Sequence, residues 1–70
     1  MDIQKILGLN IRKHRVAANL SQEELAARMN MDQGYISKLE AGQKNPTVST
    51  VQQIALAMNT PIEKLFSLNE

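Results

Sequence analysis

Side chains that can cap the N-terminus of a helix recur along this chain of 70 residues, and each precedes a short apolar run. Their oxygens can accept hydrogen bonds from the free backbone N–H groups of a first helical turn. The capping residues are Ser21, which forms a capping box with Glu24, then Asp32, Thr47 and Thr60. No alternation of apolar and polar residues persists long enough to indicate a strand. The chain is therefore predicted to fold into short helices joined by tight turns.

Apolar residues spaced by three or four predict five helices. The first spans Ile3 to Ala18, where apolar residues follow the helical period. The buried residues expected on the later helices are Leu25, Ala26 and Met29, then Ile36 and Leu39, then Val48, Val51, Ile54, Ala55 and Met58, and finally Ile62, Leu65 and Phe66. Gly42 is placed to end the third helix in a left-handed conformation. Pro61 suits the first position of the fifth helix, after a Thr60 cap.

Length and composition limit how a domain of such helices can be stabilised. The 70 residues form one domain, and the absence of cysteine excludes disulfides and thiolate zinc sites. Because the single His14 cannot hold a metal alone, no metal and no cofactor is expected. A core this small relies on helix packing and on self-association.

The N-terminal residues contain no apolar run typical of a signal peptide, and no apolar segment of the sequence is long enough to span a membrane. We therefore expect a cytoplasmic, nucleoid-associated protein with no membrane partner. The net charge of +1 does not by itself indicate a nucleic-acid partner. The last few residues are expected to form a loose tail. No sensor domain is expected after residue 70, so an inducer would act through a partner protein or through protein concentration.

Only Asn30 and Met31 separate the second helix from the cap at Asp32. A turn this sharp needs a residue with positive φ, and asparagine adopts that conformation more readily than other non-glycine residues. Two short helices joined in this way, with the small Ala26 where they cross, form a helix-turn-helix unit.

The chain from residue 21 to residue 40 reads SQEELAARMNMDQGYISKLE. This stretch resembles the helix-turn-helix of the phage Cro and repressor family, also called the XRE family. The resemblance continues through residues 45–47, 54–55 and 61–65, so it covers nearly the whole chain. Asn19, Asn30 and Asn59 stand where the family most often has glycine, and asparagine is the next best residue there. The resemblance implies an all-α, compact five-helix lambda-repressor-like domain over residues 1–70, with its motif at residues 21–40.

In that family the second helix of the motif lies in the major groove of double-stranded DNA. The DNA-binding residues that the resemblance implies are Gln22, Gln33, Gly34, Tyr35, Ser37, Lys38, Lys44 and Asn45. Gln33 is the expected base reader, because its amide donates and accepts at once and so pairs with adenine. Lys38 can reach either guanine or a phosphate.

Other positions in this set carry different expectations. Gly34 either permits close approach of the backbone to DNA or is a tolerated loss of a base contact, at a cost of about 1 kcal/mol to the helix. Tyr35 either donates to a phosphate or packs against its helix. Gln22, at a helix N-terminus, is expected to hold a phosphate. Lys44 and Asn45, in the loop before the fourth helix, are expected to do the same.

An ion pair between Arg15 and Glu40 is also implied by the resemblance, the alternative being that both face water. A homodimer is expected through the fifth helix and the adjoining face of the fourth, by way of Leu56, Ile62 and Phe66. Such a two-fold dimer would place its recognition helices about 34 Å apart and read a palindromic operator. The alternative is a monomer in which Leu56 and Phe66 pack onto the first helix.

These expectations describe a sequence-specific DNA-binding transcriptional regulator, a repressor or controller, and not an enzyme. The chain offers no nucleophile with a base and no carboxylate pair, and His14 is interpreted as a solvated helix residue. The rival hypothesis is a protein-interaction module such as an antitoxin or adaptor, with a toxin or other protein as partner. The roles of phage repressor, restriction-modification controller and antitoxin stay open.

Overall fold

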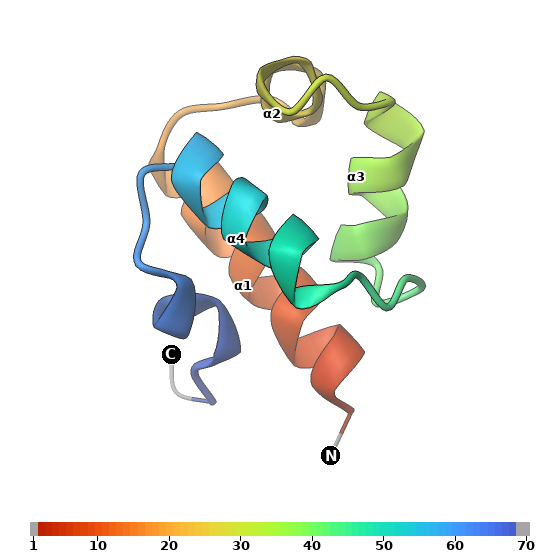
Figure 1. Ribbon diagram of the computed structural model, residues 1–70, viewed down its shortest axis with the longest axis vertical. Coiled ribbons are helices and arrows are strands. Elements are labelled where there is room, and N and C mark those ends of the chain that lie inside the picture. The colour runs from red at the N-terminus through yellow and green to blue at the C-terminus, as the bar shows by residue number, and fades with distance from the viewer. Residues whose placement is uncertain (1, 69–70) are drawn as a thin grey trace.

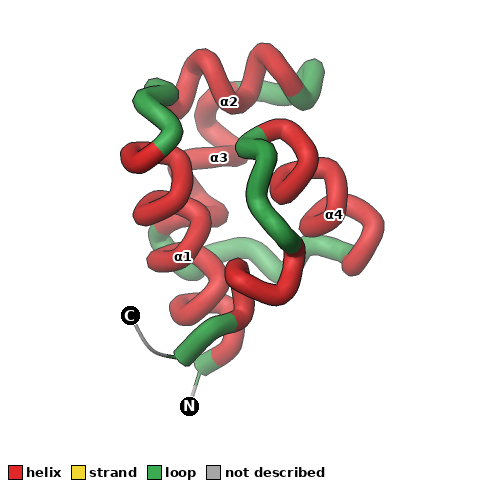
Figure 2. The backbone as a smooth tube through the Cα atoms, turned by 90° about the vertical axis from the view of Figure 1, so that its left-hand side faces the viewer, coloured by secondary structure: helices red, strands yellow, loops and turns green. Residues whose placement is uncertain are grey.

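The computed structural model describes residues 2–68, and it is built from helices. The elements are α1 (Ile3–Ala17), α2 (Gln22–Arg28), α3 (Gln33–Glu40), α4 (Val48–Ala57) and the 3-10 helix η1 (Ile62–Phe66). In Figure 1, α1 lies between α3 on one side and η1 on the other, and it contacts both. Figure 2 shows α2 lying across one end of the molecule, above α1 and α4. The end of the expected tail, residues 69–70, lies outside the described residues.

Capping side chains start three of the four α-helices. Asp2 accepts hydrogen bonds from two backbone amides of the first turn of α1, and Thr47 accepts one at the start of α4. Ser21 and Glu24 form the expected capping box, with bonds of 2.9 and 2.8 Å. Asp32 stands at the expected N-cap of α3, but its side chain makes no capping bond there. That part of the prediction was wrong.

Residues with positive φ end all four α-helices, as the sequence predicts. Asn19, Asn30 and Asn59 have φ values of 63°, 55° and 55° and follow α1, α2 and α4, while Gly42 has a φ of 76° and follows α3. Asparagine tolerates this region because its short polar side chain can bond locally. The sharp turns between helices therefore rest on these four residues.

The core lies where the four α-helices and η1 meet. Its buried apolar residues are Leu7, Ile11, Leu20, Leu25, Ala26, Ile36, Leu39, Val51, Ile54, Ala55, Met58 and Leu65. Three apolar residues expected to be inward are exposed, namely Ile3, Phe66 and Val48, and Val48 is 76% accessible. All three line one depression between the start of α1, the start of α4 and η1. Periodicity alone does not indicate which apolar positions stay uncovered.

The fifth element differs from the expected α-helix. Its backbone bond from the Lys64 N–H to the Pro61 carbonyl spans three residues, as in a 3-10 helix. Pro61 occupies the N-cap in place of Thr60, whose hydroxyl donates instead to the Met58 carbonyl at 3.3 Å. The described chain therefore has four α-helices and one short 3-10 helix.

Asn10 explains how this short element is held. It is the buried polar residue of the core, 7% exposed, and its Nδ2 donates to the carbonyls of Leu65 at 3.0 Å and Ser67 at 2.9 Å. A longer α-helix would satisfy such carbonyls within its own backbone. Here α1 supplies the donors from a side chain, and η1 docks against it.

Gly8 marks the closest approach of α1 to α3. A Cβ atom built on it would lie 2.4 Å from the Leu39 carbonyl oxygen and 2.7 Å from that of Glu40. Both neighbours are backbone atoms, which cannot turn aside as a flexible side chain can. Only glycine fits here, and the end of α3 is thereby held against the middle of α1.

Candidate nucleic-acid interface

α2 and α3 form a helix-turn-helix whose turn is fixed by backbone geometry. The Met31 N–H donates to the Ala26 carbonyl at 2.8 Å, and Asn30 takes the left-handed conformation between the helices. Ile36 and Leu39 direct the inner side of α3 into the core, where both are buried. The opposite side of α3 is left to solvent.

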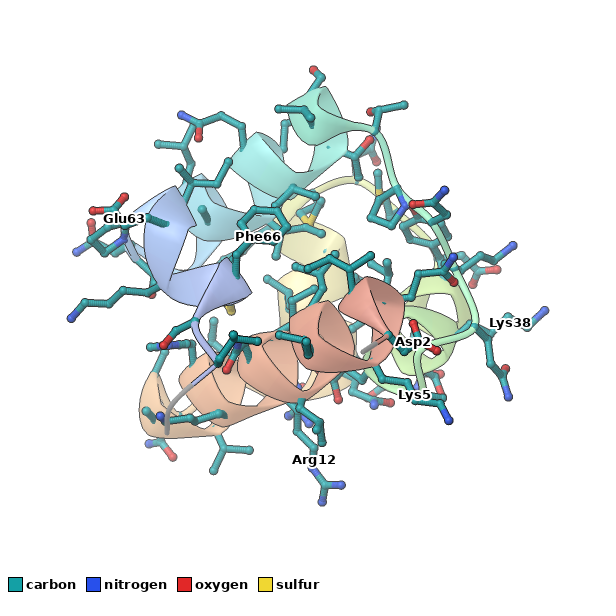
Figure 3. The ribbon with its side chains drawn as sticks, turned by 90° about the horizontal axis from the view of Figure 1, so that it is seen from below. Asp2, Lys5, Arg12, Lys38, Glu63 and Phe66 are labelled. Atoms are coloured by element: carbon teal, nitrogen blue, oxygen red, sulfur yellow. The ribbon has the colours of Figure 1, made fainter. Side chains whose placement is uncertain are left out.

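The expected reading residues lie on that outer side. Gln33, Ser37 and Lys38 are exposed, and Figure 3 shows Lys38 extending away from the body of the molecule. Gly34 is half-buried and has open space around it, because an added Cβ would meet only Asp32 Oδ2, at 3.9 Å. The internal packing of the domain therefore does not require glycine at position 34.

Tyr35 and Lys44 lie together beside the outer side of α3. Tyr35 packs against the core, and the Lys44 ammonium lies 5.8 Å from the centre of its ring, within range of a cation–π interaction. Asn45, the next residue of the loop, is exposed. This contact places Lys44, in the loop before α4, next to the recognition helix.

Arg15 and Glu40 form a bidentate ion pair between α1 and the end of α3. Arg15 Nε lies 2.6 Å from Glu40 Oε2, and its Nη2 donates to Oε1 at 3.1 Å. The third guanidinium nitrogen donates to the Leu20 carbonyl at 2.8 Å. The side chains are 12% and 5% exposed, so the pair does not face water.

The ion pair continues into the two glutamines expected at the DNA. Gln22 Nε2 donates to Glu40 Oε1 at 3.0 Å, and Gln33 Nε2 donates to Gln22 Oε1 at 2.7 Å. We call the chain of residues Arg15–Glu40–Gln22–Gln33 the reading network. It joins α1, α2 and α3 and ends on the first residue of the recognition helix. Each member was expected from the sequence to have a role, but their connection was not.

Glu24, at the start of α2, is an ionisable group with a perturbed titration. The backbone N–H of Ser21 first, and its hydroxyl second, hold the pKa of the Glu24 carboxyl below its usual value of 4.5. Because the folded pKa is depressed, the stabilisation is present above that value and is lost as the pH falls through the lower folded pKa. The helix that carries Gln22 is thus best capped when Glu24 is ionised.

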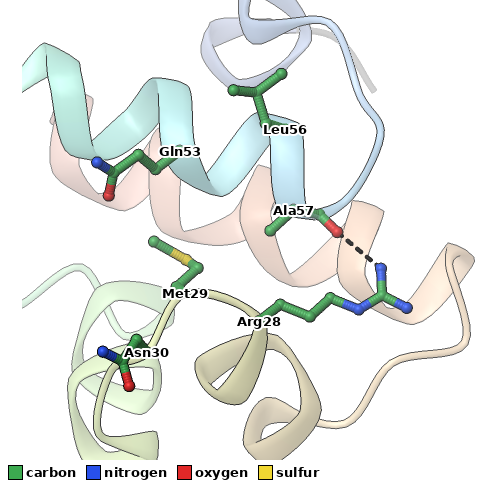
Figure 4. Close-up of a pocket in the computed structure, with 6 residues that line it drawn as sticks. All are labelled: Arg28, Met29, Asn30, Gln53, Leu56 and Ala57. Atoms are coloured by element: carbon green, nitrogen blue, oxygen red, sulfur yellow. Dashed lines mark hydrogen bonds between the residues drawn. The ribbon is translucent and has the colours of Figure 1, made fainter.

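The residues expected at a dimer interface do not share one pocket. Leu56 is 69% exposed and borders an open depression of about 480 Å³ beside α2, shown in Figure 4. Phe66 lies at another depression, of about 190 Å³, together with Ile3 and Val48. Ile62 is half-buried against the core. Leu56 therefore does not pack onto α1 as the monomer alternative requires.

Arg28 ties the helix-turn-helix to α4 at the same depression. Its Nη1 donates to the carbonyl of Ala57, the last residue of α4, at 2.9 Å (Figure 4). Within residues 2–68 no cluster of three His, Cys, Asp or Glu side chains could hold a metal ion. No helix in that part of the chain is long and apolar enough to cross a membrane.

A helix-turn-helix family model matches residues 11–65 of the chain. The chain belongs to the XRE-type helix-turn-helix family. It is 42% identical over 67 residues to the control protein C.SmaI of Serratia marcescens, covering 96% of this chain and 80% of that protein. It is 43% identical over 58 residues to an uncharacterized HTH-type transcriptional regulator, y4dJ, of Sinorhizobium fredii, covering 83% of this chain and 75% of that protein.

Solved structures of similar fold agree with this membership. The fold is similar to that of the restriction-modification controller protein C.AhdI from Aeromonas hydrophila, with a TM-score of 0.85, 32% identity, and coverage of 90% of this chain and 96% of that one. A hypothetical transcription factor from Neisseria gives a TM-score of 0.89 at 32% identity, with coverage of 94% and 76%. Homologues of this XRE-type chain are thus controller proteins and transcriptional regulators.

Three contacts of this XRE-type domain were not expected from the sequence. They are the Asn10 bonds to η1, the glycine contact of Gly8 and the Arg28 bond to α4. Each joins parts of the chain that are far apart in sequence, so no local pattern indicates it. A glycine and an asparagine inside an otherwise strong helix were the available signals, because both residues are unfavourable there.

Proposed function

We propose that this chain is a sequence-specific double-stranded DNA-binding regulator of transcription that acts as a restriction-modification controller. The observation that carries the proposal is an exposed recognition helix whose first residue, Gln33, is held in place by the reading network. The relatives named control or controller proteins support the assignment. The whole chain would work as one non-enzymatic domain in the cytoplasm, at the nucleoid.

Gln33 has the chemistry for reading a base. An amide carries two N–H donors and one carbonyl acceptor, and one N–H is given to Gln22. The remaining N–H and the carbonyl oxygen match N7 and N6 of adenine in the major groove. Ser37 and Lys38 follow along the same exposed side of α3, and Gly34 leaves room for the duplex backbone to approach.

Phosphate contacts would position the domain without reading sequence. We assign this role to residues around the edges of α3, where the Lys44 ammonium lies over the Tyr35 ring. The phosphate-binding set is Gln22, Tyr35, Lys44 and Asn45. Loss of such a contact weakens binding to all duplexes alike.

A homodimer on a palindromic operator completes the proposal. Leu56 and Phe66 are exposed apolar side chains on α4 and η1, and the half-buried Ile62 lies in η1 with Phe66. Burying them in a second copy would stabilise a small core. Sedimentation at micromolar concentration is expected to give a dimer for the wild type and a monomer for Leu56→Glu. A monomer in both cases would contradict the dimer.

Selection of bound sequences from a random duplex pool tests the function directly. The wild type is expected to enrich a palindrome. Gln33→Ala is expected to cost about 1 to 3 kcal/mol on the best operator and little on random DNA, because it removes base contacts only. Equal weakening on both would show that α3 does not read the bases. In a gel-shift assay with random duplex as competitor, the wild type is expected to retain its selected operator. If the retardation showed no dependence on sequence, the protein-interaction hypothesis would replace this one.

A further inference from the structure

We propose that Glu40, whose side chain is largely buried in its ion pair with Arg15, sets the base preference of Gln33 by fixing the orientation of two amides in sequence. The inference rests on the proposed function, because it assigns a positioning role within the same site. It depends on the direction of each hydrogen bond in the reading network and on the burial of its first two members.

The network begins at a group that can only accept. The Glu40 carboxyl group forms an ion pair with Arg15 in which both of its oxygens accept hydrogen bonds, and its side chain is 5% exposed. Whichever end of the Gln22 amide faces it must therefore be the Nε2 end, as the 3.0 Å bond shows. The carbonyl end of Gln22 is thereby turned towards α3.

The same constraint passes to the next residue. Because Gln22 presents its carbonyl, Gln33 must present Nε2 to it, at 2.7 Å. Gln33 is left with one N–H and its carbonyl oxygen, one donor and one acceptor, and this is the pattern that adenine complements. Because the carboxylate of Glu40 can only accept hydrogen bonds, Gln33 is oriented so that it prefers adenine.

Reversing the chain of amides reverses the preference. If Gln22 presented Nε2 to α3, Gln33 would use its carbonyl oxygen to accept that bond. Two N–H groups would then face the DNA, and guanine, whose N7 and O6 both accept, would be the complementary base. A largely buried carboxylate therefore decides between two purines.

The position of Glu40 is fixed at its side chain by Arg15 and at its backbone by Gly8, so the orientation is not free to change. Arg15 binds both carboxylate oxygens and is itself anchored on the Leu20 carbonyl. The backbone of α3 at Glu40 lies against Gly8, where no side chain fits between the helices. Each neighbour belongs to the folded domain and is in place before DNA binds.

Glu40→Gln is the direct test, because it keeps the size of the side chain while adding an N–H donor. The measured quantity is the ratio of dissociation constants for two operators that carry A·T or G·C at the base pair read by Gln33. That pair is identified as the one at which Gln33→Ala abolishes the preference. The wild type is expected to favour adenine by about 10-fold or more, and Glu40→Gln to reduce that ratio by at least about 5-fold. A smaller reduction overturns the proposal.

Arg15→Lys is the matched control for lost stability. It leaves the Glu40 carboxylate in place while removing the fork and the bond to Leu20. All proteins are compared well below their unfolding midpoints. Arg15→Lys is expected to lower the midpoint without changing the adenine-to-guanine ratio. A ratio reduced as far as in Glu40→Gln would show that destabilisation alone is responsible, and would overturn the proposal.

Gln22→Leu gives an independent route if Glu40→Gln does not fold. It leaves the ion pair intact and interrupts the network at its second bond. The adenine preference is expected to fall as in Glu40→Gln, and a wild-type ratio overturns the relay. If the wild type selects no sequence at all, the proposed function fails as well. If it selects adenine through Gln33 but Glu40→Gln keeps that preference, only the relay fails.

Discussion

Two polar contacts that differ in kind link α1 to segments distant along the chain. Towards the recognition helix, Arg15 holds the carboxylate of Glu40 with two charged hydrogen bonds. Towards the C-terminal end, the neutral amide of Asn10 holds two backbone carbonyls of the η1 region. Both joints connect segments that are distant along the chain, and both are largely buried.

The two joints differ in the groups to which they lead. The charged joint continues through side chains to the residue that faces DNA, whereas the neutral joint ends on backbone atoms. A change at Glu40 is therefore expected to alter both stability and base preference. A change at Asn10 is expected to alter stability only. Substitutions at these joints and beside them test the contrast.

Gly8→Ala is expected to have the largest effect. Helix propensity alone would favour alanine by about 1 kcal/mol. However, the new Cβ would lie 2.4 Å from the Leu39 carbonyl oxygen, so α1 and α3 would have to separate. We expect a net loss of about 3 kcal/mol in the free energy of unfolding, measured by denaturant titration. Gly34→Ala is the control, because open space around it predicts a gain of up to about 1 kcal/mol. Equal losses in both variants would contradict the close contact.

Glu40→Ala is expected to destabilise the domain by about 1 to 3 kcal/mol, because Arg15 would keep a charge that is largely buried and has lost its partner. The unfolding midpoint measures this change. Glu63→Ala, which removes an exposed carboxylate from η1, should stay within about 0.5 kcal/mol of the wild type. An unchanged midpoint in Glu40→Ala would mean that the ion pair contributes no stability.

Asn10→Ala is expected to cost about 1 to 2 kcal/mol, because the carbonyls of Leu65 and Ser67 lose their donor. Amide hydrogen exchange should show faster opening of η1 than of α3. The ratio of affinities for the adenine and guanine operators should match that of the wild type. A shifted ratio would remove the contrast between the two joints.

Lys44→Ala is expected to have the smallest effect on stability, about 0.5 kcal/mol, through the lost contact with the Tyr35 ring. Its effect should appear in DNA binding. Affinity for all duplexes should fall, and the slope of log affinity against log salt should decrease by about one, because a phosphate contact is lost. A loss confined to the best operator would assign Lys44 to base reading instead.

Local chemistry was predictable from the sequence. Asn19, Asn30 and Asn59 end helices because the left-handed conformation depends on the residue itself. The capping box at Ser21 is equally local. The fifth element was expected to be an α-helix and is the short η1 instead. The Leu65 carbonyl in it accepts a hydrogen bond from Asn10, 55 residues away, and local sequence does not indicate such a bond.

The candidate site was predictable as a set of residues but not as a network. Gln22 and Gln33 were both expected at the DNA, each with its own role. Their mutual bond depends on how two side chains meet across a turn, and its direction depends on a carboxylate contributed by the end of α3. The spacing of residues along the sequence does not indicate the orientation of a side-chain amide.

The bond from Arg28 to Ala57 places a positive charge at the C-terminus of α4, where the sequence of that helix provides none. The last carbonyls of a helix carry partial negative charge, and a cation near them is stabilising. α4 has no basic residue in its last turn, so the positive charge comes from the end of α2. In chimeras that exchange α4 between relatives, the helix would keep this neutralising charge only where position 28 supplies a side chain long enough to reach it. The two helices should therefore be exchanged together.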